Sequence, residues 1–191
     1  MDRITNVLIA GVGGQGTILA SDLLSHAAFT SGYDVKKSEV HGLAQRGGSV
    51  ITQVRFGGKV HSPLIPAGRA DYMLAFELVE AARYANLMRA DGTVLVNDQR
   101  IPSSTILARQ ESYPNDPLAG VREAVGECKV IPAAEEALKL GNPRVANVIM
   151  LGALAKRIGL AEDAFREAIR ELVKPRFVEL NLKAFDVGLG Y

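Results

Sequence analysis

Apolar residues at the start of the chain follow the pattern of a strand, a helix and a second strand. Residues 7–10, VLIA, form an unbroken apolar run, which is typical of a parallel strand covered on both faces. A glycine-rich loop follows, and apolar positions then recur at helical spacing from residue 17 up to Gly32, a suitable helix stop. The run YDVKKSEV, residues 33–40, predicts the second strand. This order is a βαβ unit, which is expected to cross over with right-handed sense.

The middle of the chain departs from a plain βα repeat. Glycine pairs at 47–48 and 57–58 enclose the alternating run SVITQVRF, which predicts a strand pair or hairpin-like excursion in place of a second crossover helix. The βα rhythm then resumes, with a strand expected over 72–76, a helix over 78–88 and a strand over 92–98.

The remainder of the chain is expected to be mainly helical. Loop is predicted over 101–127, a strand over 128–133, and helices over 133–141, 143–159 and 161–173. Residues 1–191 therefore predict a single α/β domain. Its expected architecture is a Rossmann-like, mostly parallel sheet flanked by helices, with a hairpin-like excursion and a helical C-terminal third.

The glycine loop is the first candidate site. Gly11, Gly13 and Gly16 satisfy G-x-G-x-x-G in the strand–loop–helix context that dinucleotide binding requires. The first glycine permits a tight turn, the second lets the backbone approach a pyrophosphate, and the third allows close helix–strand packing. The helix N-terminus presents unpaired N–H groups to an anion, and Thr17 can add a hydroxyl.

Two features argue against ordinary NAD binding. The position about 20 residues further on should be acidic to hold the ribose hydroxyls, but this region reads VKKS. Lys36 and Lys37 favour a 2′-phosphate instead, although adjacent strand residues face opposite ways. Gln15 is large and polar, and it can reach a neighbouring chain or a ligand. Nucleotide or phosphate binding and a structural loop at an interface both stay open.

A second polar segment, HGLAQRGGS, follows the second predicted strand. In a doubly wound sheet this position overhangs the crevice where ligands bind. Arg46, beside Gly47 and Gly48, can make bidentate contact with a carboxylate or phosphate; the alternative is a tight turn with a solvated arginine. With His41 and Gln45, these residues form a candidate interface for substrate or partner.

Composition and charge restrict the function further. With a formal net charge of +1, the chain has no broad attraction for nucleic acid or an anionic membrane. Cys128 is the only cysteine, which excludes an internal disulfide and any four-cysteine cluster or zinc site built from this chain alone. The three histidines are far apart, and no metal site or catalytic residue is predicted. The amino terminus does not read as a signal peptide, and a cytoplasmic protein is expected.

Three stretches together resemble the gamma domain of the 2-oxoacid:ferredoxin oxidoreductases. They are GVGGQGTILASDLLSHAAFTSGYDV, KSEVHGLAQRGGSVITQVRFG and RADYMLAFELVEAARY. By position, the family's glycine loop matches Gly11, Gly13, Gly14, Gln15 and Gly16. The family's second motif matches Arg46, Gly47 and Gly48. No catalytic residue is carried over.

The resemblance implies an enzyme that oxidatively decarboxylates arylpyruvates such as indolepyruvate to aryl-acetyl-CoA and passes electrons to ferredoxin. It places thiamine diphosphate and the iron–sulfur clusters on a large alpha subunit, with CoA as co-substrate. The chain is then a small, non-autonomous subunit that can form a homodimer when isolated. The alternative is a free-standing nucleotide-binding protein or NADP-dependent reductase.

Overall fold

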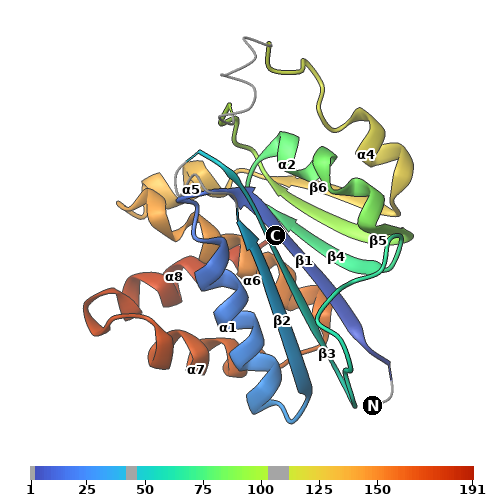
Figure 1. The fold of residues 1–191 in the computed structure, drawn as a ribbon. Helices are drawn as coiled ribbons and strands as arrows, with labels where there is room; N and C mark the ends of the chain where they lie inside the picture. Colours follow the sequence, from blue (N-terminus) through green and yellow to red (C-terminus); the bar gives the residue numbers. More distant parts are fainter. Residues whose placement is uncertain (1–2, 42–46, 103–111) are drawn as a thin grey trace.

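The computed structural model describes residues 3–41, 47–102 and 112–191. Its described strands form a six-stranded sheet with the order β2-β3-β1-β4-β5-β6 (Figure 1). The strands are β1 (Thr5–Val12), β2 (Asp34–His41), β3 (Ser49–Gly57), β4 (Ala70–Ala75), β5 (Met88–Asn97) and β6 (Glu127–Ile131). β1, β4, β5 and β6 pair in parallel, whereas β3 is antiparallel to both β1 and β2. The prediction of a mostly parallel sheet is confirmed.

Helices cover both faces of this sheet. They are α1 (Thr17–Thr30), α2 (Leu78–Arg83), α4 (Ala119–Ala124), α5 (Ala133–Lys139), α6 (Ala146–Ile158), α7 (Glu162–Leu172) and α8 (Val178–Leu189), with 3-10 turns η1 (Ala85–Leu87), η2 (Pro143–Val145) and η3 (Pro175–Phe177). α1 and α5 to α8 lie on one face, and α2 and α4 lie on the other (Figure 1). The helical C-terminal third is thus confirmed.

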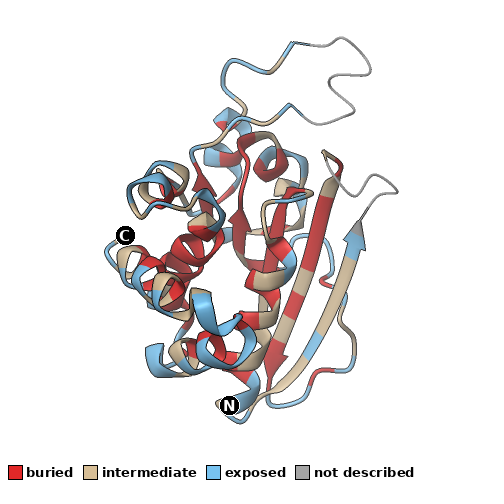
Figure 2. Ribbon diagram, turned by 90° about the vertical axis from the view of Figure 1, so that its left-hand side faces the viewer, coloured by how far each residue is buried: buried red, intermediate tan, exposed pale blue. Residues whose placement is uncertain are grey.

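The apolar run of β1 is explained by burial on both faces. Val7 and Ile9 are fully buried in the core beside α1, whereas Leu8 is fully buried in the core beside α2. A strand between two helical layers has no solvated face, so its sequence does not alternate. Strand β2, at the sheet edge, is intermediate or exposed where β3 beside it is largely buried (Figure 2).

The hairpin-like excursion predicted around residue 50 consists of β2 and β3. The two strands pair antiparallel along their length, from Asp34 opposite Gly57 to His41 opposite Val50. β3 also pairs antiparallel with β1, so it lies between the two strands of the first βαβ unit. The consequence is that the start of β3 comes beside the end of β1, with Ser49 opposite Val12.

Several elements differ from the expectation, and one of them is α4, which lies inside the stretch predicted as loop over 101–127. The helix predicted over 78–88 ends at Arg83, and β5 begins at Met88, four residues before the predicted 92. Met88 is buried and pairs with Ala70 across a register shift, so tertiary contact overrides the local helical pattern.

Helices α6 and α8 pack closely through glycine. A Cβ atom built on Gly188 would lie 2.1 Å from the Ile149 carbonyl oxygen, and one on Gly152 would lie 2.3 Å from the Phe185 carbonyl oxygen. The helix α8, at Val178–Leu189, is absent from the elements predicted from the sequence. Across the described parts of the chain, every helix is too short or too polar to cross a membrane.

Candidate functional site

A crevice of about 350 Å³ lies where the carboxyl ends of β1, β4 and β5 meet the start of α6. The residues around it come from the glycine loop, the turn before β3, the segments at the ends of β4 and β5, the α5–α6 connection and the start of α6. They are Val12, Gly13, Gly14, Gln15, Gly47, Phe76, Asn97, Gln99, Ile101, Pro143, Arg144, Ala146 and Asn147. In open α/β sheets this edge is where ligands bind.

The glycines of the loop serve internal packing as well as its turn. Gly16 has a φ of +80°, and a Cβ on it would lie 2.4 Å from Asn147 Nδ2. The Gly13 N–H donates to the Gly48 carbonyl oxygen at 2.8 Å, which joins the loop to the second predicted motif. The N–H group of Gly13, the glycine expected to let the backbone approach a pyrophosphate, is therefore already bonded within the chain. By contrast, Gly14 is exposed, with open space where its Cβ would be.

The Gln15 side chain is turned into the protein. Its Oε1 accepts from the Val12 N–H at 2.7 Å, and its Nε2 donates to the Phe76 carbonyl at 2.8 Å and to Gln99 Oε1 at 3.0 Å. Asn97 Nδ2 donates to the same two oxygens, at 3.2 and 3.0 Å. The Gln15 side chain thus ties the loop to the ends of β4 and β5, and its contact with a neighbouring chain or a ligand stays a prediction.

Two buried asparagines complete this network of amides. Asn97 is 1% exposed, and its Oδ1 accepts from the Ala134 N–H in the first turn of α5. Asn147 is 3% exposed, and its Nδ2 donates to the Gly16 carbonyl at 3.1 Å. Asn147 is not among the site residues predicted from the sequence. Its one signal is that it is a polar residue beside the apolar run VIMLGALA.

The chemistry of the crevice suits holding a ligand or partner. Among the described residues that line the crevice, Arg144 is the one charged side chain, and it is exposed in η2 just before α6. The other polar groups are amides and backbone N–H groups, which neither donate protons readily nor act as nucleophiles. Among the described residues, no three His, Cys, Asp or Glu side chains gather closely enough to hold a metal ion.

The remaining predicted site residues take different positions. Gly47 lines the crevice, and Gly48 is buried behind it. Thr17 is 4% exposed as the first residue of α1, so its hydroxyl contact with an anion stays a prediction. His41 ends β2, and its side chain is outside the described set; Gln45 and Arg46 also lie outside the described residues.

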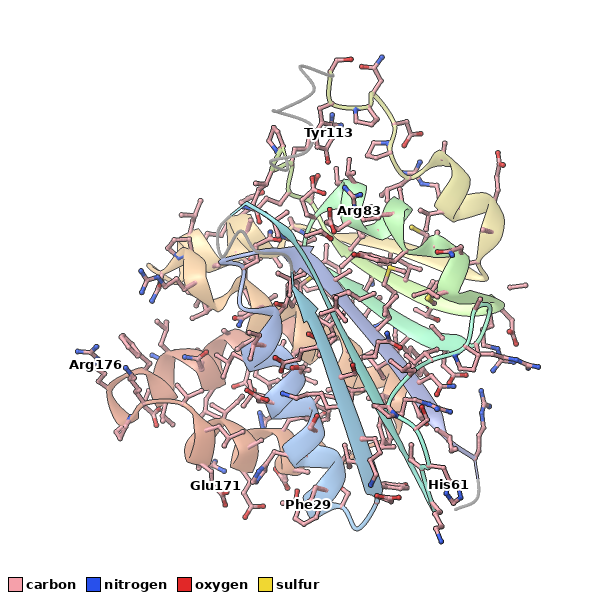
Figure 3. The ribbon with its side chains drawn as sticks, in the orientation of Figure 1. Phe29, His61, Arg83, Tyr113, Glu171 and Arg176 are labelled. Atoms are coloured by element: carbon pink, nitrogen blue, oxygen red, sulfur yellow. The ribbon has the colours of Figure 1, made fainter. Side chains whose placement is uncertain are left out.

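A buried carboxylate anchors the start of β3 just after the second motif. Glu80 on α2 is fully buried, and its carboxylate accepts hydrogen bonds from Ser49 Oγ and from Arg83 Nε, the latter at 3.0 Å. Ser49 Oγ also lies 2.9 Å from the Tyr84 hydroxyl. Figure 3 labels Arg83 on this α2 side of the sheet.

Glu77, which follows the end of β4, caps α2. Glu77 is fully buried, and its Oε2 accepts from the Val79 and Glu80 N–H groups at 2.7 and 3.0 Å. Its Oε1 accepts from the Tyr113 hydroxyl. Burial raises the pKa of Tyr113, and the hydrogen bond to Glu77 raises it further. This carboxylate therefore has a structural role.

The lysine pair gives no support to NADP binding. Lys36 pairs with Asp34 at 2.8 Å, and Lys37 pairs with Asp22 on α1 and with Glu39. Burial lowers the pKa of Lys37, but the hydrogen bonds to both carboxylates outweigh it, so the pKa is raised overall. Lysines already neutralised by carboxylates make a poor site for a 2′-phosphate.

The family model described as pyruvate ferredoxin/flavodoxin oxidoreductase matches residues 6–191. The chain belongs to this family. The resemblance noted from the glycine loop and the second motif is thereby confirmed.

Individual family relatives are similar over most of their length. The indolepyruvate oxidoreductase subunit IorB of Pyrococcus horikoshii is 40% identical over 191 residues, covering 96% of this chain and 94% of that protein. The keto/oxoacid ferredoxin oxidoreductase gamma subunit of Geobacter sulfurreducens superposes with a TM-score of 0.72 at 25% identity, covering 97% and 96% of the two chains.

The fold also occurs inside a longer polypeptide. The 2-oxoglutarate:ferredoxin oxidoreductase of Magnetococcus marinus, solved with 2-oxoglutarate, coenzyme A and succinyl-CoA bound, superposes with a TM-score of 0.76 at 20% identity. The match covers 100% of this chain and 31% of that one.

Proposed function

We propose that this chain is the small subunit of an indolepyruvate:ferredoxin oxidoreductase, inactive alone and completed by a larger alpha subunit. The reaction is the oxidative decarboxylation of indolepyruvate and other arylpyruvates to aryl-acetyl-CoA, with CoA as co-substrate and ferredoxin as electron acceptor. Residues 1–191 act as one gamma-type domain of this enzyme. The observation that carries the proposal is the 40% identity to an indolepyruvate oxidoreductase subunit over nearly the full length of both chains.

The residues of this chain do not fit the redox cofactors of such a reaction. A cluster needs several thiolate ligands, but Cys128 is the one cysteine of the sequence, and burial raises the pKa of its thiol. We therefore assign the iron–sulfur clusters to the alpha subunit, and we assign thiamine diphosphate to it because the family resemblance implies that placement.

The crevice is the part of this chain that we assign to the composite active site. Its loop is rigid, because the Gln15 amide makes three internal hydrogen bonds and the Gly13 N–H bonds to Gly48. Rigid backbone at the sheet edge, with exposed Gly14 and Arg144 in front of it, offers a preformed surface for the partner or for an anionic group of CoA. The role is to position groups and exclude water.

Reconstitution with the alpha subunit tests the proposal. Indolepyruvate- and CoA-dependent reduction of ferredoxin is expected when both chains are present and not with either chain alone. Full activity of the alpha subunit by itself would refute a required small subunit. Activity with pyruvate but not with arylpyruvates would refute the substrate assignment while leaving the family intact.

A variant pair then tests the crevice. Arg144→Gln should lower kcat/KM of the assembled enzyme about tenfold, the cost of one charged hydrogen bond. Arg170→Gln, an exposed arginine on α7 away from the crevice, is the matched control and should leave activity unchanged. Equal effects of the two variants would exclude a specific role for the crevice.

A further inference from the structure

A second cavity, of about 300 Å³, lies beside the glycine-loop crevice where α1 meets the α6 start and the α7–α8 connection. Leu19, Val145, Val173 and Phe177 contribute apolar and aromatic walls. Val145 and Val173 are buried, so these walls are fixed by the core. A volume of this size accepts one ring-bearing small molecule.

Two positively charged side chains line this cavity. Arg144 and Lys174 both line it, both are exposed, and neither forms an ion pair with another described residue. The contrast with nearby Arg166 is clear, because Arg166 pairs with Glu162 and Asp186. Unneutralised cations at an apolar cavity favour a ligand with a negative charge next to an apolar body.

A buried amide at the same cavity adds a hydrogen-bond acceptor. Asn181 on α8 is 6% exposed, and its Nδ2 donates to the Phe177 carbonyl at 2.8 Å. That bond uses the amide nitrogen, no hydrogen bond among the described residues is donated to the amide oxygen, and Asn181 lines the cavity. An amide oxygen so placed suits a ligand N–H or O–H group.

We propose that this cavity binds a small aromatic carboxylate. The ring lies between the apolar walls, the carboxylate meets Lys174 and Arg144, and a ring N–H or O–H donates to Asn181 Oδ1. All of these groups belong to this chain, so binding at this cavity requires neither the alpha subunit nor the proposed reaction.

Titration calorimetry with the full chain tests the site. The probes are indole-3-acetate, phenylacetate, the neutral phenylacetamide and plain acetate. Indole-3-acetate should bind about fivefold more tightly than phenylacetate, because its ring N–H adds a hydrogen bond. Phenylacetamide, which lacks the charge, and acetate, which lacks the ring, should each bind at least about tenfold more weakly than phenylacetate. Equal binding of phenylacetamide and phenylacetate would overturn the role of the cations.

Variants separate this cavity from the crevice. Arg144 lines both, whereas Lys174 lines this cavity alone and Gln99 lines the crevice alone. Lys174→Gln should weaken phenylacetate binding about tenfold, and Gln99→Leu should leave it unchanged. Sensitivity to Gln99→Leu but not to Lys174→Gln would place the ligand in the crevice and refute the proposal.

Asn181→Leu gives an independent check. It should remove the preference for indole-3-acetate over phenylacetate while retaining phenylacetate binding. An unchanged preference would show that the ring donor does not meet Asn181. Absence of saturable binding of any aromatic acid would refute the site altogether.

Discussion

Gly16→Ala most directly tests whether the glycine loop packs against Asn147. Gly16 is in the left-handed region and abuts the buried Asn147 side chain, whereas Gly14 is left-handed with open space around its Cβ position. An alanine at either position is therefore strained by the positive φ, but only an alanine at Gly16 also meets the Asn147 side chain. Gly14→Ala is the matched control.

The magnitudes follow from this comparison. A left-handed alanine costs about 1–2 kcal/mol, and this applies to both variants. At Gly16 the added Cβ would lie 2.4 Å from Asn147 Nδ2, and such overpacking costs roughly another 1–3 kcal/mol. Gly16→Ala should therefore lower the free energy of unfolding by about 2–5 kcal/mol, and Gly14→Ala by about 1–2 kcal/mol.

Urea unfolding at constant m-value measures both changes. The double variant Gly16→Ala/Asn147→Ala should be less destabilised than the sum of its single variants, because Asn147→Ala removes the clashing amide. Equal destabilisation by Gly14→Ala and Gly16→Ala, with additive behaviour in the double variant, would refute the packing role of Asn147.

Three further predictions concern other parts of the fold. Tyr113→Phe should cost about 1–2 kcal/mol at neutral pH by removing the hydrogen bond to Glu77. The pKa of Tyr113 is raised in the folded chain, so Tyr113 stabilises the fold fully below the tyrosine pKa of the unfolded chain, about 10, and this stabilisation is lost as the pH rises above that value. The free energy of unfolding, measured at pH 8 and at a pH above 10, should therefore fall less in Tyr113→Phe than in the natural chain. Ser49→Ala and Glu80→Gln should couple by at least about 1 kcal/mol in a double-mutant cycle; additive losses would show that the two side chains act separately. The Cys128 thiol, whose pKa burial raises, should react with a thiol reagent at pH 8 much more slowly in the folded chain than in urea, and equal rates would contradict its burial.

The sequence predicts the fold wherever local pattern and burial agree. The apolar run 7–10 and the hairpin-like excursion appear as β1 and as β2 with β3. The elements that the sequence does not predict depend on contacts between residues far apart in the chain. β5 starts early because Met88 pairs with Ala70, and α8 packs on α6 through Gly188. Periodicity detects a face of one element, not the partner that covers it.

The candidate site shows the same division between motif and environment. G-x-G-x-x-G correctly locates a strand–loop–helix turn at the ligand-binding edge of the sheet. What the loop does there depends on Gln15, Gln99 and Asn147, which are brought together from separate parts of the chain.

Each of these amides uses hydrogen-bonding capacity that a nucleotide site would keep for its ligand. The third glycine gives a further example, since its missing side chain admits Asn147 of α6 at 2.4 Å from the Cβ position. The pattern that permits close approach of a pyrophosphate also permits close approach of another part of the protein. The glycines thus establish that something approaches the backbone closely, and only the tertiary structure shows that at Gly16 it is the chain itself.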